Sequence, residues 1–245
     1  MTGYLAKAAL CASALFALCA PAHAATVIGG SDLLTPTHAA QMETWLTGDP
    51  QLAYSGPLTF TNIFDKAPGD TSTEFHAAAD GMGPTFFVVE ATDIRNPGVT
   101  QIIGGYNPVS WRSDDTWTDT PAIEDRLAFL FNLVMNEVRQ QSNHPAAHYQ
   151  TYNGGFGPTF GAGTDLLVNA DLMGGSAVPG GYCLDTTVYC NGGTNIMGNS
   201  NNAPNQLIFG ALEVFTISAV PIPAAAPLLL GALGLTGWIA RRRKG

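Results

Sequence analysis

The sequence predicts a mostly β (α+β) domain, a β-sandwich flanked by short helices, on three observations. Short apolar segments rich in β-branched and aromatic residues recur along the chain, separated by turn residues. Two stretches carry helix-capping signals and helical spacing. Phe129, Phe131, Phe209 and Phe215 mark the later apolar segments as core. Many short strands with two small helices are typical of a sandwich.

Each of the two expected helices has its own start signal. Thr35 can cap a helix whose first position is Pro36, and Gly48 lies just past its expected end. Thr71 and Glu74 have the spacing of a capping box, which predicts a second, shorter helix. The two helices are expected to flank the strands.

The other apolar segments are expected to be strands, because their residue types suit a half-buried pleated surface. In chain order they cover residues 57–64, 85–91, 101–106, 127–134, 148–152, 165–169 and 207–217. The region between the two chain ends, residues 25–219, is long enough for one substantial core, and it contains no segment typical of a linker. One domain is therefore expected.

The N-terminal end, residues 1–24, is predicted to be a secretory signal peptide. Lys7 precedes an apolar run over residues 8–20, and Ala22-His23-Ala24 forms a small-residue cleavage site before Ala25. The Sec export machinery is therefore an expected partner, and the mature domain is expected outside the cytoplasm.

The C-terminal end, residues 220–245, combines a proline motif, an apolar span and a basic cluster. The motif consists of Val220, Pro221, Ile222, Pro223 and Ala224. Residues 224–240 carry no charge and are just long enough for a transmembrane helix, and the basic residues 241–244 would keep the C-terminus in the cytoplasm.

This order of features resembles the VPLPA variant of the PEP-CTERM sorting signal of Gram-negative bacteria. The resemblance implies recognition by an exosortase, transient anchoring in the inner membrane, cleavage near the motif, and release to the cell surface or the extracellular matrix. The alternative is a plain single-pass anchor. Sorting is preferred because two prolines directly before the span and a terminal basic run rarely coincide.

The charge of the mature region excludes some partners. All nineteen carboxylates lie within residues 25–219 but only five basic residues do, which gives a formal charge of −14. Such a domain would repel nucleic acid and anionic lipid. Membrane contact is therefore expected only through the C-terminal helix before processing.

Cysteine usage fits an exported protein. Two of the four cysteines leave with the signal peptide, and Cys183 and Cys190 remain, with six residues between them. In an oxidising compartment a structural disulfide is expected. The alternative, a reactive thiol pair, is less favoured because the spacing is not Cys-x-x-Cys and no histidine is near.

One hexapeptide pattern occurs twice, at residues 81–86 and 155–160, as Gly-x-Gly-Pro-Thr-Phe. Its glycines are expected to permit positive φ before a proline that sets the entry of a strand. The chain also carries Phe75-His76, Asp80, Gly104-Gly105-Tyr106, Ser110-Trp111, the segments 128–133 and 161–165, and Leu212-Glu213-Val214-Phe215. In this order and spacing, these pieces resemble a TLDc domain over residues 58–217.

The resemblance implies a two-sheet antiparallel β-sandwich of TLDc type with flanking helices, in agreement with the periodicity. In eukaryotes such domains are linked to protection from oxidative stress and to binding the vacuolar proton pump, a partner that an exported bacterial protein would not meet. The family has no agreed catalytic residue, so the resemblance implies a binding module. One departure is Ala79, where related sequences often have Cys; this removes the thiol expected for a redox role.

The acidic loop at residues 114–119 is a candidate contact surface. Asp114, Asp115, Trp117 and Asp119 place carboxylates and an aromatic ring between expected strands. The carboxylates could hold Ca²⁺, but their spacing is not that of an EF-hand loop, and a solvated acidic turn is preferred. No metal or other cofactor is therefore predicted. The loop at residues 180–205 is a second candidate surface.

Two residue pairs that contain histidine have four-residue spacings that need an explanation. His144 and His148 would share one face of a helix and could bind a metal there, but Pro145 favours a solvated loop. His76 and Asp80 would also share a helix face, and the preferred interpretation is a partly buried histidine beside a helix-terminal residue.

Two hypotheses of function remain. Glu213 lies on a strand expected to be buried and needs a partner, either Arg126 or a backbone donor. The preferred hypothesis is a non-enzymatic surface or matrix protein that binds a glycan, a protein or a cation. The alternative is a secreted carboxylate-dependent glycan hydrolase with a pair such as Asp165 and Glu213, which must lie about 5–9 Å apart. The sequence spacing does not show such a pair.

Overall fold

The computed structural model describes residues 25–190, 192–199 and 206–220. The expected signal peptide, the transmembrane segment 224–240 and the sorting motif beyond Val220 lie outside the described residues. Part of the second candidate loop, residues 191 and 200–205, also lies outside them. Among the described residues, no helix is both long and apolar enough to cross a membrane.

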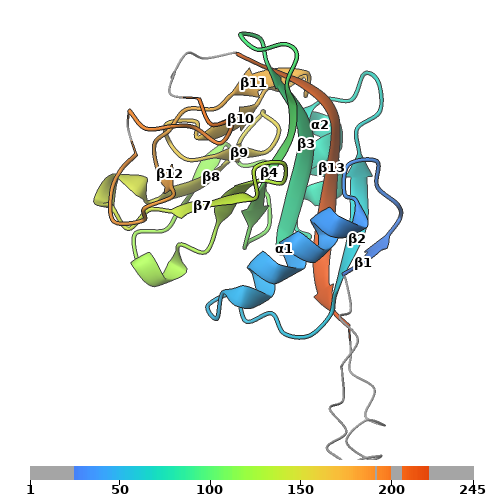
Figure 1. Ribbon diagram of the computed structural model, residues 1–245, viewed down its shortest axis with the longest axis horizontal. Coiled ribbons are helices and arrows are strands. Elements are labelled where there is room, and N and C mark those ends of the chain that lie inside the picture. The colour runs from blue at the N-terminus through green and yellow to red at the C-terminus, as the bar shows by residue number, and fades with distance from the viewer. Residues whose placement is uncertain (1–24, 191, 200–205, 221–245) are drawn as a thin grey trace, which may run out of the picture.

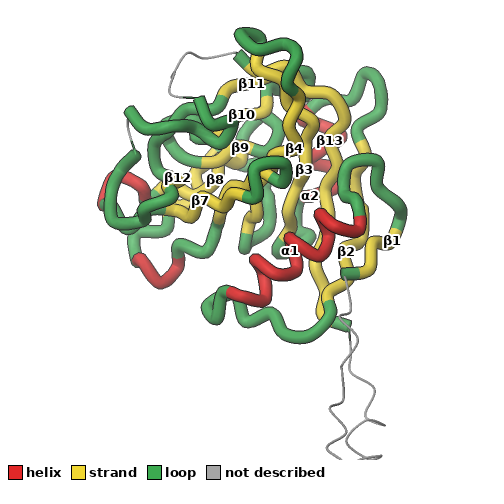
Figure 2. Tube along the Cα trace, viewed as in Figure 1, coloured by secondary structure: helices red, strands yellow, loops and turns green. Residues whose placement is uncertain are grey.

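The described chain is mostly β, as predicted, with two α-helices and short 3-10 turns among the strands and loops (Figure 2). The helices are α1 (Pro36–Gly48) and α2 (Ser72–Ala79), with 3-10 turns η1 (Ile123–Asp125) and η2 (Pro145–Ala147). The strands are β1 (Thr26–Ile28), β2 (Leu58–Asp65), β3 (Thr85–Asp93), β4 (Thr100–Asn107), β5 (Thr116–Asp119), β6 (Phe129–Asn132), β7 (Glu137–Gln141), β8 (Tyr149–Asn153), β9 (Thr159–Phe160), β10 (Leu166–Val168), β11 (Gly174–Ser176), β12 (Tyr182–Cys183) and β13 (Leu207–Ala219).

Both helices begin where the capping signals predict. The Thr35 side chain accepts a hydrogen bond from the backbone N–H of His38, and Pro36 occupies the first turn of α1. Thr71 and Glu74 form the expected capping box at the start of α2, which satisfies N–H groups that the helix itself leaves unpaired. The helix starts are therefore determined locally.

The described strands are hydrogen-bonded into one continuous sheet, and the two separate sheets predicted from the sequence are not seen among them. The strand order is β12-β7-β6-β4-β3-β13-β11-β10-β9-β8-β5, and β2 pairs with both β13 and β1. Neighbouring strands are antiparallel, except that β1 and β2 are parallel.

The sheet folds back on itself at β13, which gives it a sandwich-like core without a second sheet. β3 pairs along one edge of β13, and the other edge is shared, with β11 at Leu207 and Ile208 and with β2 from Glu213 onward. The sheet then continues from β11 through β10, β9 and β8 to β5. Within this run Phe160 of β9 stacks on Phe87 of β3, with ring centroids 6.0 Å apart. Alternation along a strand predicts which side chains are buried but not which strand edges pair. The sequence therefore could not distinguish one folded sheet from two stacked sheets.

Apolar cores lie on both faces of the central strands β3 and β13, and each face is covered by one helix (Figure 1). Met42 and Leu46 of α1 pack on the face that also carries Phe215. Phe75 and Ala79 of α2 pack on the opposite face, which the returning strands also cover. This packing holds α2 on that face, where the exposed side of the helix forms one wall of a surface cleft.

The two hexapeptides use their glycines for different reasons. In the first copy Gly81 and Gly83 have φ of 74° and 78°, as expected from the sequence. In the second copy Gly157 does not have a positive φ; a Cβ there would lie 2.6 Å from the side chain of Leu172. The second glycine is therefore required by close packing rather than by backbone conformation.

Candidate functional site

A surface cleft with a volume of about 550 Å³ lies between α2, the loop after β4 and the loop after β8. Its lining residues are Ser72, Thr73, His76, Ala77, Asp80, Ser113, Asp115, Gly154 and Gly155. Another cleft, of about 620 Å³, lies beside Trp45 and Phe129, but Asp49 is its only titratable group. The cleft at α2 therefore concentrates the polar chemistry, and we take it as the candidate site.

α2 places two of its side chains at this cleft because of its length and its packing. Phe75 and Ala79 face the core, which leaves His76 and Asp80, one helical turn apart, at the edge of the cleft. His76 is buried, whereas the side chain of Asp80, the C-cap residue, remains 28 % exposed.

Trp111 anchors the second wall. Its ring is buried, packs edge-on against Phe75 and Phe160, and donates a hydrogen bond from Nε1 to Thr85 Oγ1 at 3.0 Å. A bridge between the backbones of Trp111 and Asp80 ties the loop to the end of α2. Because Trp111 is fixed in the core, the exposed residues that follow it are held over the cleft.

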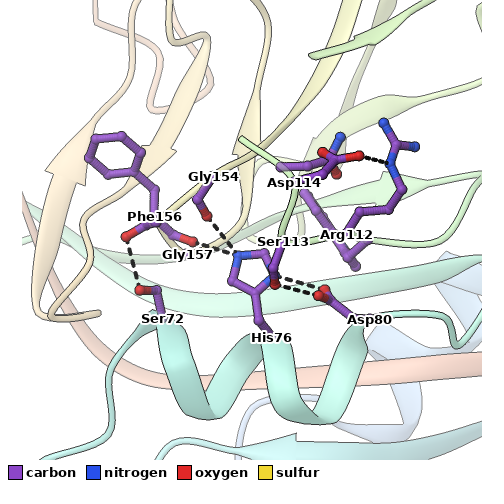
Figure 3. Close-up of polar contacts among 12 residues, drawn as sticks. Ser72, His76, Asp80, Arg112, Ser113, Asp114, Gly154, Phe156 and Gly157 are labelled. Atoms are coloured by element: carbon purple, nitrogen blue, oxygen red, sulfur yellow. Dashed lines mark hydrogen bonds and ion pairs between the residues drawn. The ribbon is translucent and has the colours of Figure 1, made fainter. Parts of the chain in front are cut away.

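His76 and Asp80 together join three segments of the chain (Figure 3). Its Nδ1 lies 2.7 Å from Asp80 Oδ1, and its Nε2 lies 2.9 Å from the carbonyl oxygen of Gly154 and 3.1 Å from that of Phe156. Asp80 accepts a further hydrogen bond from Ser113 Oγ at 2.5 Å. Both ring nitrogens therefore face oxygen acceptors. The ring fastens α2 to the loop after β8, and Asp80 links the same helix to the loop after β4 through Ser113.

Ser72, His76 and Asp80 are residue types of a catalytic triad, but their contacts do not form one. Ser72 Oγ donates to the carbonyl oxygen of Gly155 at 2.9 Å, not to His76. A triad needs a hydrogen bond between the nucleophile and the imidazole, and here the nitrogen that would serve as base is occupied by two carbonyl groups. The cluster is therefore arranged to position loops rather than to activate a nucleophile.

The carboxylates of the predicted acidic loop do not point to a common centre. Asp115 lines the cleft and accepts a hydrogen bond from the Tyr152 hydroxyl, which raises the pKa of Tyr152. Asp114 accepts from Thr116 and from Arg112, and these bonds lower the pKa of Asp114. Each carboxylate is thus held by its own partner.

The remaining two residues of that loop lie on β5. Asp119 contacts His148, with Oδ1 2.7 Å from the ring Nδ1. Trp117 lies against Tyr152, with ring centroids 4.8 Å apart. The structure therefore separates Asp115, at the cleft, and Asp114, paired with Arg112, from Asp119, which lies beside His148 at the start of β8.

No metal centre is assembled from these groups. His144 caps η2 and its Nδ1 accepts from the N–H of Ala146, so it does not converge with His148. Within the described ranges, no three His, Cys, Asp or Glu side chains lie close enough to hold one ion. The residues proposed for Ca²⁺ in the sequence do not share a common centre.

A disulfide joins Cys183 and Cys190, whose Cα atoms are 5.8 Å apart. Cys183 lies at the end of β12, which pairs with β7, so the bridge closes a local loop against the sheet. Neither cysteine lines the cleft at α2. The bridge therefore supports the second candidate loop without taking part in the candidate site.

The carboxylate pair of the hydrolase hypothesis is not assembled into a cleft. Glu213 is fully buried and accepts hydrogen bonds from Ser31 Oγ and from the backbone N–H of Asp32 at 2.6 Å, not from Arg126. Asp165 is also buried and accepts from the N–H groups of Gly181 and Tyr182 at 3.0 and 2.9 Å. These carboxylates bind different segments, and neither lines a cleft described above.

Burial raises the pKa of Asp165 to about 7, although its hydrogen bonds with backbone N–H groups act in the opposite direction. A carboxyl group with such a pKa can serve as a general acid, but only where it reaches a substrate. Asp165 is 2 % exposed. Its role is therefore to fasten the segment of Gly181 and Tyr182.

Sequence reasoning missed most of the cleft. Ser72, Ser113 and Gly154 lie far apart in the chain and belong to no spacing motif. Two signals were usable: the four-residue interval between His76 and Asp80, which correctly predicted a shared helix face, and the acidic loop, whose Asp115 lines the cleft. The partners of that pair come from segments that only the folded sheet brings together.

Together these observations define a β-rich domain with a polar surface cleft. The histidine, serine and aspartate side chains of that cleft form hydrogen bonds with other residues of the domain. The model of one family, described as the TLDc domain, matches residues 27–218. The chain therefore belongs to the TLDc domain family. No curated protein matches the chain.

Proposed function

We propose that this chain is an exported, exosortase-sorted protein of the cell surface or extracellular matrix, whose TLDc domain acts as a non-catalytic binding module. The N-terminal segment with its Ala22-His23-Ala24 site supports export through the Sec machinery. The proline motif, apolar span and basic end of residues 220–245 support sorting at the membrane. The domain between them then reaches the exterior, where its surface meets glycans and matrix proteins.

The observation that carries the binding role is the bonding pattern of the cleft. Ser72 and His76 are engaged with backbone carbonyls, so the cleft presents a fixed polar wall rather than an activated nucleophile. Thr73, Ser113 and Asp115 are exposed at its rim and can exchange hydrogen bonds with a ligand. A rigid frame with exposed polar groups is typical of a binding site.

The test uses the full chain and a strain of the native host from which its gene is deleted. Thr73→Trp fills the cleft from an exposed position and leaves the His76 contacts in place; Ala67→Trp adds the same ring at an exposed position outside the cleft. We expect wild type and Ala67→Trp to bind the deleted cells equally, and Thr73→Trp to bind about tenfold more weakly. Equal binding by all three proteins would exclude the cleft as the contact surface.

The same preparation tests the hydrolase alternative. We expect no release of reducing sugar from isolated surface polysaccharide by the wild-type chain. Turnover that stops in Asp165→Asn or Glu213→Gln, in variants that remain folded by circular dichroism, would replace the binding role with glycan hydrolysis.

A further inference from the structure

Five partly or fully exposed rings on β5, on β8 and on the residues beside β8 form a continuous row; we call it the aromatic stripe. Its members, in order of contact, are His148, Tyr149, Trp117, Tyr152 and Phe156. Successive ring centroids are 4.0, 5.5, 4.8 and 6.1 Å apart. β8 alone spans about 17 Å at about 3.3 Å per residue. The stripe is therefore long enough for an extended ligand.

The stripe joins two clefts. At one end Tyr152 bonds to Asp115, which lines the cleft at α2. At the other end His148 and Asp119 line a further cleft of about 450 Å³, together with Arg126. The stripe and the two clefts therefore form one continuous surface, aromatic in the middle and polar at both ends.

The polarity of β8 is inverted relative to an ordinary strand of a half-buried sheet. Three of its residues, Gln150, Thr151 and Asn153, are polar and have no exposed surface. Its two rings, Tyr149 and Tyr152, are only half-buried. Core formation would place the rings inside. Partly exposed rings beside fully buried polar residues leave aromatic surface on this strand that a ligand can contact.

We propose that the aromatic stripe binds a linear glycan built from uncharged hexoses, an assignment that rests on the binding role proposed above. A pyranose ring presents a face of C–H groups that packs on aromatic rings, while its hydroxyl groups need hydrogen-bond partners around the edge. The Tyr152 hydroxyl and the carboxylates of Asp115 and Asp119 lie along the stripe and supply such partners.

Charge selects against acidic polymers. Two exposed carboxylates, Asp115 and Asp119, contact Tyr152 and His148 of the stripe, and the mature region carries nineteen acidic residues against five basic ones. Uronic acids and phosphate-bearing polymers would be repelled. Neutral sugar hydroxyls can donate to the same carboxylates.

A peptide is the less suitable occupant. Among the described strands β5 ends the sheet, and it would have to accept a peptide along its edge. It has four residues, and its pairing with β8 shifts register between Trp117 and Asp119. Short, irregular edges are poor templates for strand addition.

The test is affinity electrophoresis of the full chain in non-ionic detergent, in native gels that contain a neutral glucan, a mannan, a galactan, an N-acetylhexosamine polymer or alginate. We expect retardation by at least one neutral polymer and none by alginate. Trp117→Ala removes the central ring, and we expect its apparent Kd to rise about tenfold. Trp117→Phe keeps a ring and should retain most of the affinity.

Ile208→Ala is the matched control, because Ile208 is an exposed apolar residue of β13 outside the stripe. It should migrate as wild type does, and all variants should keep the wild-type melting temperature within about 3 °C. Equal retardation of wild type and Trp117→Ala would overturn the stripe as the site.

Cell binding and gel retardation together distinguish the glycan assignment from the binding role on which it rests. If no neutral polymer retards the chain while it still binds cells of the deletion strain, the glycan assignment is wrong and the binding role stands. Retardation by alginate in place of the neutral polymers would overturn the charge argument and the assignment with it. If the chain binds neither the polymers nor the cells, both proposals fail.

Discussion

The imidazole of His76 and the carboxylate of Asp80 are hydrogen-bonded at 2.7 Å across one turn of α2, and the far side of the same ring holds the loop at Gly154. One side chain therefore sets the spacing between a helix and a loop that is 78 residues away in the chain. The cleft keeps its shape because of this contact.

Replacing His76 with Ala should destabilise the domain. The carbonyl groups of Gly154 and Phe156 and the carboxylate of Asp80 would each lose a partner, and the expected loss in unfolding free energy is about 2 kcal/mol. Urea unfolding followed by tryptophan fluorescence measures it. Thr73→Ala, at an exposed position of the same helix, is the control and should change stability far less. Equal losses in the two variants would contradict the fastening role of His76.

Asp165 should make the domain less stable as pH rises. Its pKa is about 7 in the folded state and 3.8 ordinarily, so the contribution is fully present below about pH 4 and is lost as pH approaches 7. Between about pH 5 and pH 8 we expect wild type to lose about 2 to 3 kcal/mol of unfolding free energy through this group. Denaturant titrations at several pH values measure the slope.

Two variants isolate the effect of Asp165. Asp165→Asn cannot ionise, so its unfolding free energy should vary less with pH, although its amide faces the N–H groups of Gly181 and Tyr182 and lowers stability throughout. Asp171→Asn removes an exposed carboxylate and should follow the wild-type slope. Parallel slopes for wild type and Asp165→Asn would show that Asp165 does not carry the pH dependence.

The disulfide between Cys183 and Cys190 should stabilise the domain without affecting binding. Replacing both cysteines with Ser should cost about 2 to 3 kcal/mol, because the open loop gains conformational freedom in the unfolded state. Cell binding should persist, since neither cysteine lines the cleft. Calorimetry and thiol labelling test the bridge, and complete labelling of both thiols in the unreduced native protein would disprove it.

Processing should remove both chain ends in the native host. Intact-mass analysis should show a product that begins near Ala25 and lacks the residues beyond the Val220–Ala224 motif. Replacing Pro221 and Pro223 with Ala should leave the tail attached if the motif is what the exosortase recognises. Surface protein that retains Arg241 to Lys244 in the wild type would reduce the tail to a plain membrane anchor.

The sequence alone determined the features that depend on near neighbours. Thr35 and Thr71 cap α1 and α2 because their partners lie within three residues. The longer strands follow from alternation and side-chain type, and the bridge between Cys183 and Cys190 from their spacing and the expected compartment. Short strands such as β9 and β12, with two residues each, carry too little pattern to be found in this way.

Only the tertiary structure decided how the strands join and what the surface offers. One folded sheet and two stacked sheets have the same alternation, and the division of one edge of β13 between β2 and β11 distinguishes them. The cleft brings Ser72, Ser113 and Gly154 together, and the stripe aligns Trp117 with Tyr149 and Tyr152. These contacts join segments far apart in sequence, where loop closure and core packing set the geometry and no local spacing encodes it.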